Sequence, residues 1–248
     1  PGNTPECRTW AVMVRCPLVV AMLLFLAVTP AWTQNHPVVP TGAMRNTMFN
    51  GQLAGLVQLD SLASPGTYGI GPLEYLRGEL LLWDGHAFVA TAEGDGAMTV
   101  EELPESRAPF FVHQHVGRWT EVELPDQVHD HATLDAYLTE RFADLDVPFA
   151  FKLAGRFDDV ATHLVDVPPG TSIAGPEDAH RWNKHFHHEE VGMDMLGFFS
   201  TRHQAVFTHH DSHIHVHAIS EDRDAMGHVE EMRFRAADVL LFVALPER

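Results

Sequence analysis

The sequence has little cysteine and few basic residues. Its two cysteines, Cys7 and Cys16, both precede residue 34, so a chain cut there has none. Disulfides and thiolate metal ligands are then excluded. Lys and Arg number 16 against 34 Asp and Glu, which gives a formal net charge of −18. Such an acidic surface argues against nucleic acids and anionic membranes as partners.

The apolar run near the N-terminus is too short for a comfortable membrane span. It covers residues 18–28, follows Arg15, and ends shortly before the small residues Ala31 and Thr33. This order is typical of a secretory signal peptide, which we predict over residues 1–33. The mature protein is then expected to be periplasmic or secreted, with no stable membrane association after cleavage. An uncleaved membrane anchor is the alternative.

The rest of the chain lacks internal repeats, and its apolar runs are short. Asp-Gly, Pro-Pro-Gly and Gly-Pro separate these runs, a pattern typical of strands joined by turns. Asp84-Gly85 between two apolar runs predicts a hairpin. Helical spacing of apolar residues predicts a helix over 132–144 and a looser one over 42–62. Residues 168–176 are expected to form a loop between two halves.

Histidine is abundant, with 18 residues, and one group of histidines has a chemically informative spacing. His215 and His217 lie two apart, so on a strand both side chains point to one face. After a polar turn the chain returns with His228. Three neutral imidazoles form a catalytic zinc site with one position open. His213 lies on the same face, so the ligand set is ambiguous, and a chance His-x-His pair is the alternative.

The segment HVHAISEDRDAMGHV, residues 215–229, resembles the signature H-x-H-F-I-S-E/D-D-R-x-x-G-G-H of the alpha-acetolactate decarboxylases. Other segments are similar to that family in the same order along the chain. They are residues 68–90, 109–119, 148–165 and 195–207. The resemblance therefore extends over roughly residues 45–246.

The resemblance implies a fold, a ligand set and a reaction. The fold is α/β in the broad sense, a β-rich α+β arrangement with a mixed-sheet N-terminal domain, 34–167, and a smaller, mostly β C-terminal domain, 168–248, that carries the metal site. The zinc ligands are His215, His217 and His228. The reaction is that of a carboxy-lyase: 2-acetolactate, a small keto acid, loses CO2 through a metal-stabilised enediolate and yields acetoin. The resemblance also implies a homodimer.

Two further positions are candidates for catalysis. Glu79 matches a glutamate that lies near the metal in the family, and His163 stands where the family has an arginine. A guanidinium has a permanent charge and a fork that grips carboxylates, whereas an imidazole carries a proton near neutral pH. We assign Glu79 and His163 as catalytic residues. For Glu79 the alternative is an exposed carboxylate at a strand edge.

Three functions remain open at this stage. The first is the zinc-dependent acetolactate decarboxylase. The second is a divergent zinc enzyme that acts on another 2-hydroxy-3-keto acid, because His163 replaces the arginine. The third is a non-enzymatic extracytoplasmic protein that holds several zinc ions in the clusters at 185–190 and 209–217. We expect the histidines at 185–190 and 209–210 to lie in solvated loops. His113 and His115 either line the zinc cavity or have a structural role.

Overall fold

The computed structural model describes residue 2 and residues 34–94 and 96–246. The predicted signal peptide lies outside the described residues, apart from residue 2, so it stays a prediction, as does secretion. Contacts divide the chain after residue 30, and every helix and strand among the described residues belongs to the unit 31–248. No helix among the described residues is long and apolar enough to span a membrane.

The first sheet has six strands in the order β1-β8-β3-β4-β5-β6, each antiparallel to its neighbours. Their bounds are β1 Val39–Thr41, β3 Thr67–Pro72, β4 Glu79–Trp83, β5 His86–Ala92, β6 Met98–Glu102 and β8 Phe111–His115. A small separate sheet joins β2 (Val57–Gln58) to β7 (Arg107–Ala108). The hairpin predicted at Asp84-Gly85 is confirmed. Both turn residues have positive φ, 52° and 85°, as a two-residue hairpin turn requires.

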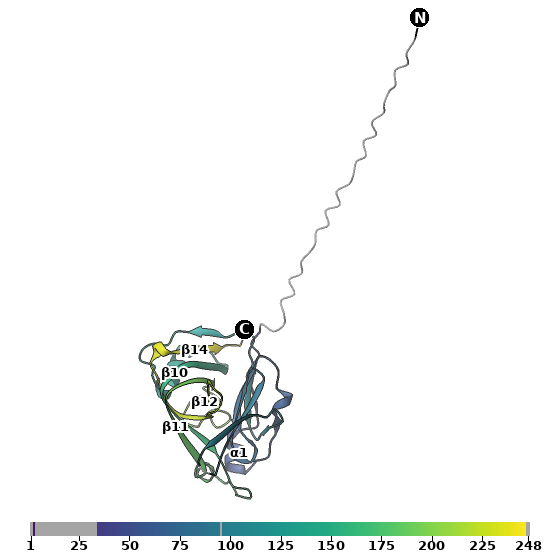
Figure 1. Ribbon diagram of the computed structural model, residues 1–248, viewed down its shortest axis with the longest axis vertical. Coiled ribbons are helices and arrows are strands. Elements are labelled where there is room, and N and C mark those ends of the chain that lie inside the picture. The colour runs from purple at the N-terminus through teal and green to yellow at the C-terminus, as the bar shows by residue number, and fades with distance from the viewer. Residues whose placement is uncertain (1, 3–33, 95, 247–248) are drawn as a thin grey trace. The chain divides into compact units, whose positions relative to one another are not determined.

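The second sheet has the order β11-β12-β13-β10-β14-β9, and β10 also pairs with β11. Strands β10 to β13 therefore close into a ring, while β14 and β9 extend from β10. The bounds are β9 Thr120–Val122, β10 Phe149–Val165, β11 Asn183–Phe199, β12 Ile214–Ser220, β13 Met226–Arg233 and β14 Val239–Ala244. In Figure 1 the labelled strands β10, β11, β12 and β14 lie together, beside the first sheet and α1.

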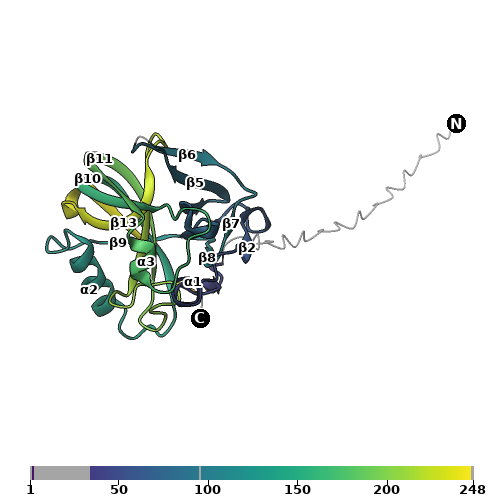
Figure 2. The ribbon, with the colours of Figure 1, turned by 90° about the horizontal axis from the view of Figure 1, so that it is seen from below.

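The helices are short, and Figure 2 draws all three on the side away from β5 and β6. They are α1 Met44–Asn50, α2 His131–Arg141 and α3 Pro176–His180, with 3-10 turns η2 Leu59–Ser61, η3 Glu74–Leu76 and η4 Ala236–Asp238. The helix predicted over 132–144 is confirmed as α2, whose start is capped by reciprocal hydrogen bonds between Asp130 and Thr133. Of the predicted helix over 42–62, only α1 forms.

Apolar side chains join the two sheets. One buried cluster takes Ile70 and Leu81 from the first sheet and Leu196, Phe198 and Ile219 from the second. Each of these side chains is completely buried. Their removal from water stabilises the contact between the sheets by about 25 cal/mol for each Å² of apolar surface. The sheets are thus held face to face, and β4 lies against β13.

The β-rich α+β class is confirmed, with one difference in detail. The first sheet was expected to be mixed, but every described pair in it is antiparallel. The reason is that β3, β4, β5 and β6 follow one another through short connections, which permit only antiparallel pairing. The proposed boundary at residue 168 stays a prediction. The second sheet takes strands from both sides of it, since β9 and β10 precede residue 168.

Gly155 provides a test of the central strand β10. Its backbone φ of 154° is one that residues other than glycine rarely adopt. A Cβ atom at this position would collide with the carbonyl oxygen of Asp238. We expect Gly155→Ala to lower the free energy of unfolding by about 3 kcal/mol or more, because backbone strain and overpacking add. Urea denaturation measures this change.

The matched control is Gly170→Ala. Gly170 also has positive φ, 83°, but no atom lies within 4 Å of the position of a Cβ. We expect a smaller loss, because only the backbone strain applies. Equal losses for the two variants would show that the contact between β10 and the segment before β14 is unimportant.

Candidate metal centre and active site

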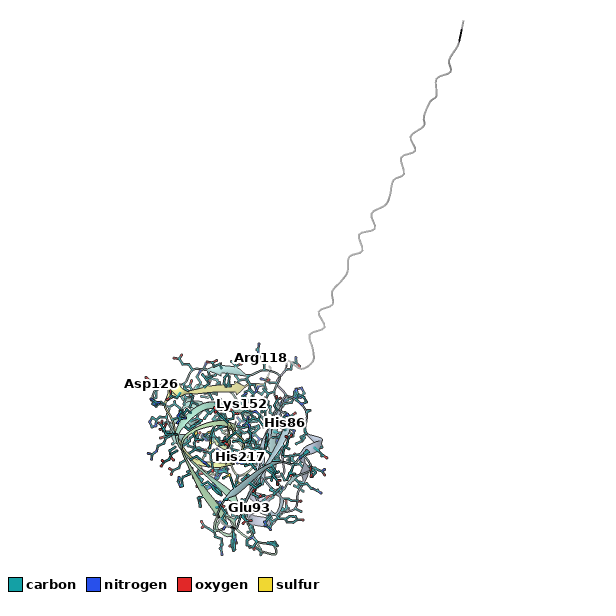
Figure 3. The ribbon with its side chains drawn as sticks, viewed as in Figure 1. His86, Glu93, Arg118, Asp126, Lys152 and His217 are labelled. Carbon is teal, nitrogen blue, oxygen red and sulfur yellow. The ribbon has the colours of Figure 1, made fainter. Side chains whose placement is uncertain are left out.

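Three histidines converge on one point inside the protein. His215 and His217 lie on β12, and His228 lies on β13 directly opposite His217. One nitrogen from each lies within 4.8 Å of the others, and all three residues are buried. Figure 3 shows His217 in the interior, whereas Arg118 and Asp126 lie at the periphery. The structure thus brings together the three histidines expected to bind metal.

Backbone carbonyls fix the orientation of two of these imidazoles. His215 donates its Nδ1–H to the carbonyl oxygen of Phe207 at 2.7 Å, and His217 donates its Nδ1–H to that of Leu80 at 3.0 Å. Because a carbonyl oxygen only accepts, both protons must be on Nδ1 in the neutral rings. Each Nε2 therefore carries a lone pair. These two Nε2 atoms are 3.2 Å apart, with acceptor facing acceptor.

Burial keeps the three imidazoles neutral. It lowers the pKa of His215 and of His228 well below the usual range, with further lowering from neighbouring histidines. It lowers the pKa of His217 to about 3, although the hydrogen bond to Leu80 opposes the shift. A metal ligand must be a neutral imidazole, so these rings are in the binding form at neutral pH.

The spacing of the nitrogens fits a tetrahedral metal ion. Nε2 of His215 lies 3.2 Å from Nε2 of His217 and 3.1 Å from Nδ1 of His228. Zinc bound tetrahedrally at about 2.0–2.1 Å separates two ligand nitrogens by about 3.3 Å. Two facing lone pairs without a proton between them repel one another, and a cation removes that repulsion. The donor set therefore suits a divalent metal.

Glu79 enters the site from the other sheet. It begins β4, is only 4% exposed, and its Oε2 lies 3.6 Å from Nε2 of His217. Burial raises the pKa of Glu79 well above the usual range, against a smaller opposing effect of a hydrogen bond from the backbone of Val165. An exposed edge carboxylate, the alternative considered above, is excluded by this burial. Glu79 is instead a protonatable group next to the histidines.

His163 completes a row of imidazoles across three strands. It lies on β10 opposite His228, with the two ring centres 4.6 Å apart. Its Nδ1 is 3.0 Å from Oε1 of Glu230, whose Oε2 is 2.9 Å from Nδ1 of His185. These hydrogen bonds lower the pKa of Glu230 to about 2. Glu230 was not predicted, yet it lies two residues after His228 on a strand, so the two-residue period could have identified it.

The other histidines depart in part from expectation. Residues 185–190 lie in strand β11, not in a loop, because they pair with β10. His210 is exposed as expected, but His209 is largely buried, with its Nε2 3.2 Å from Nε2 of His228. Burial lowers the pKa of His209 to about 4. The sequence offered no signal for this contact, since His209 lies in an irregular loop.

His213, His113 and His115, which were also considered from the sequence, lie outside the three-histidine centre. His213 is hydrogen bonded to Thr139 through Nδ1, and is not part of the three-histidine group. His113 and His115 line a separate hollow with His36, away from the metal centre. Among the described residues, His215, His217 and His228 form the one group of three or more side chains that could hold a metal ion.

A cavity of about 150 Å³ opens beside the centre. Its polar lining residues are Arg45, Glu79, His163, His180, Asn183, His209, His210, His215 and His228. The remaining wall is mostly apolar and comes from α1, α3 and nearby segments: Met44, Met48, Phe49, Pro72, Leu76, Phe110, Val165, Pro176 and Ala179. The arrangement suits a small molecule with a polar end at the imidazoles and a hydrocarbon part opposite.

Comparison with known proteins identifies similar chains. The sequence model of the alpha-acetolactate decarboxylases matches residues 42–244. The alpha-acetolactate decarboxylase of Brevibacillus brevis is 27% identical over 223 residues, which cover 85% of this chain and 75% of that relative. The one from Methanosarcina mazei is 26% identical over 205 residues, covering 79% of this chain and 66% of the relative, just under two thirds of its length.

The fold also has a counterpart among solved structures. The crystal structure of alpha-acetolactate decarboxylase from Bacillus subtilis strain 168 superposes with a TM-score of 0.69. The match covers 86% of each chain at 19% sequence identity. At this identity the likeness is one of fold.

The lowered pKa values of the buried imidazoles allow us to predict how the stability of the metal-free protein depends on pH. His217 and His209 bind protons near pH 6.5 in the unfolded chain but only near 3 and 4 in the folded one. Below about pH 6.5 the unfolded state therefore binds more protons than the folded state. For each unit by which the pH falls, each of these two histidines lowers the free energy of unfolding by about 1.4 kcal/mol. Glu79 acts in the opposite direction, because its raised pKa lets the folded chain hold a proton that the unfolded chain has lost.

Since several imidazoles oppose one carboxyl group, we expect a net loss of stability from pH 6.5 to 4. Urea denaturation of chelator-treated protein at several pH values measures it. The control is metal-free His217→Gln, which should lose less stability per pH unit than the unchanged protein. Identical slopes for the two proteins would contradict the assignment of His217 as a buried neutral group.

Proposed function

The chain belongs to the alpha-acetolactate decarboxylase family, and on that premise we propose that it is a zinc-dependent decarboxylase that converts 2-acetolactate to acetoin and CO2. The observation that carries the proposal is the convergence of three neutral imidazoles from β12 and β13 with a buried carboxyl group from β4. Membership of this family supports the assignment of decarboxylase activity. Zinc and the individual roles below are our assignments.

The donor atoms favour zinc held by Nε2 of His215, Nε2 of His217 and Nδ1 of His228. Three protein ligands leave a position open for substrate, as in catalytic zinc sites. Bound zinc supplies a Lewis acid that draws electron density from the keto and hydroxyl oxygens of the substrate as CO2 departs. The tautomers set by Leu80 and Phe207 keep the two Nε2 lone pairs available for it.

Glu79 is the proton donor in this proposal. Burial raises its pKa well above the usual range, so the carboxyl group holds a proton to higher pH than an ordinary glutamate does. The carboxyl group lines the cavity beside His215 and His228. It can therefore deliver a proton to the carbon from which CO2 has left, and the buried position keeps bulk water from competing.

His163 is assigned to the substrate carboxylate. It lines the same cavity and takes the position of the arginine of the family. Its Nδ1–H donates to Glu230, which orients the ring, so Nε2 can donate to a substrate carboxylate only in the doubly protonated imidazolium form. An imidazole grips a carboxylate through one nitrogen, whereas a guanidinium offers two, so substrate selection is expected to differ from that of members with arginine.

The apolar wall of the cavity favours a second candidate, in which the preferred substrate is a different 2-hydroxy-3-keto acid. Met44, Met48 and Phe49 of α1 line the apolar side of the cavity. The whole cavity, polar side included, measures about 150 Å³. A substrate with an alkyl group larger than methyl would bury that group on the apolar side and gain hydrophobic stabilisation.

The first experiment measures acetoin formed from racemic 2-acetolactate by the zinc-loaded protein, against an enzyme-free blank for spontaneous decarboxylation. We expect Glu79→Gln to lower kcat at least about 100-fold, because proton transfer by a positioned acid contributes that much. Zinc content should remain one ion per chain. The control is Glu101→Gln, an exposed carboxylate on β6. Turnover by Glu79→Gln equal to that of the control would refute the role of Glu79.

The second experiment compares acetolactate with an analogue in which a propyl group replaces methyl. Met48 lines the cavity, is partly exposed, and packs against the buried cluster that contains Leu76 and Val165. We expect Met48→Trp to lower kcat/KM for the analogue about 10-fold by filling the apolar hollow, and Met48→Ala to leave it nearly unchanged. Acetolactate should be affected little by either change. A preference of the unchanged protein for acetolactate would leave the first candidate in place and remove the second.

A further inference from the structure

His228 differs from the other two histidines of the centre in how its ring is held. Carbonyl oxygens accept from His215 and His217, but in the described part of the chain no backbone group is bonded to the ring of His228. Its Nδ1 is 3.1 Å from Nε2 of His215, and its Nε2 is 3.2 Å from Nε2 of His209. The side chain of His209 therefore occupies the position that a carbonyl oxygen takes for the other two.

The tautomer of His228 follows from this contact. If Nδ1 is to face the metal centre with a lone pair, the proton of the neutral ring must be on Nε2. A buried N–H requires an acceptor, because an unpaired one costs about 1–3 kcal/mol. Nε2 of His209 is the acceptor within reach. One hydrogen bond thus decides which nitrogen of His228 points at the metal.

The geometry argues against His209 as a fourth ligand. The group of side chains whose ligand atoms all lie within 4.8 Å contains His215, His217 and His228, but not His209. The ring of His209 is 5.0 Å from that of His228 but 6.0 Å from that of His215. His209 lies behind His228 as seen from the centre, so the open position needed by a substrate is preserved.

A single loop segment orients two ligands. Phe207 is buried in the core between the sheets, and its carbonyl oxygen accepts the proton of His215. Thr208 is completely buried, and hydrogen bonds of its backbone to His203 and Ala205 hold the loop. His209 follows at once and contacts His228. The segment 207–209 therefore fixes one ligand by its backbone and another by a side chain.

We propose that His209 is a positioning residue for metal binding, which accepts Nε2–H of His228 and directs Nδ1 of His228 toward the metal. The inference rests on the proposed zinc site, since without a metal the direction of Nδ1 has no role. Groups that orient metal ligands in this way change metal affinity about 10- to 100-fold when they are removed. The same range is expected here.

Zinc affinity, measured by competition with a chromogenic chelator, tests the proposal without reference to turnover. We expect His209→Phe, which fills the space but accepts no hydrogen bond, to bind zinc about 10- to 100-fold more weakly. We expect His209→Gln to recover most of the affinity, since its amide oxygen can accept from His228. The matched control is His187→Phe, the same exchange at an exposed position of β11, which should leave zinc affinity unchanged.

A second measurement reads the tautomer itself. Long-range proton–nitrogen correlation spectra of the zinc-loaded protein distinguish a protonated, a free and a metal-bound ring nitrogen. We expect His228 to have zinc on Nδ1 and a proton on Nε2, and His209→Phe to lose that single state. Urea denaturation of the metal-free variants separates this effect from a general loss of stability. If His209→Phe fails to fold, the spectrum of the unchanged protein still shows which ring nitrogen of His228 binds zinc and which carries the proton.

The outcomes separate this inference from the proposed function. If the unchanged protein binds no zinc, the proposed zinc site fails and this inference with it. If it binds zinc tightly and His209→Phe binds equally tightly, the zinc site stands and the role of His209 is overturned. Zinc on Nε2 of His228 in the unchanged protein also overturns it. Weaker binding by His209→Phe with recovery in His209→Gln supports it.

Discussion

Two hydrogen bonds from buried imidazoles to backbone carbonyls determine the character of the whole centre. The acceptors, Leu80 and Phe207, come from different parts of the fold, one from strand β4 and the other from the loop before β12. Each forces a proton onto Nδ1 and leaves a lone pair on Nε2. The resulting pair of facing acceptors is unfavourable in an interior of low dielectric unless a cation lies between them. The backbone thus prepares the site for a metal before any metal is bound.

The fold tolerates these polar groups because it surrounds them with apolar packing. Burial of a polar group in apolar surroundings is costly unless it is hydrogen bonded. Here the ring of strands β10 to β13 supplies one wall and the first sheet the other, and the cluster that contains Leu81, Leu196 and Phe198 seals them together. Glu79 lies at the same junction, and burial raises its pKa well above the usual range. The chemistry is therefore located where the two sheets meet.

Local features of the sequence predicted much of this arrangement. The hairpin at Asp84-Gly85 and helix α2 follow from turn chemistry and periodicity, and the spacing of His215, His217 and His228 indicated three side chains that the structure brings together. Contacts made by irregular segments could not be predicted. His209 is separated from its partner by a loop, strand β12 and a turn, and no local pattern indicates its direction. The closure of strands β10 to β13 into a ring likewise depends on tertiary packing, which apolar runs alone do not reveal.

The hydrogen bond from His217 to Leu80 has a consequence for the order of events during folding. Its partners are 137 residues apart in the sequence, so the bond forms only after one of the longest chain closures in the molecule. Closures of this kind come late and make folding slow. A chain emerging during synthesis has completed β4 long before β12 exists, and until the two meet the imidazole has no fixed tautomer. The tautomer of His217 is therefore fixed only once the two sheets have met, although His215, His217 and His228 themselves lie on two consecutive strands.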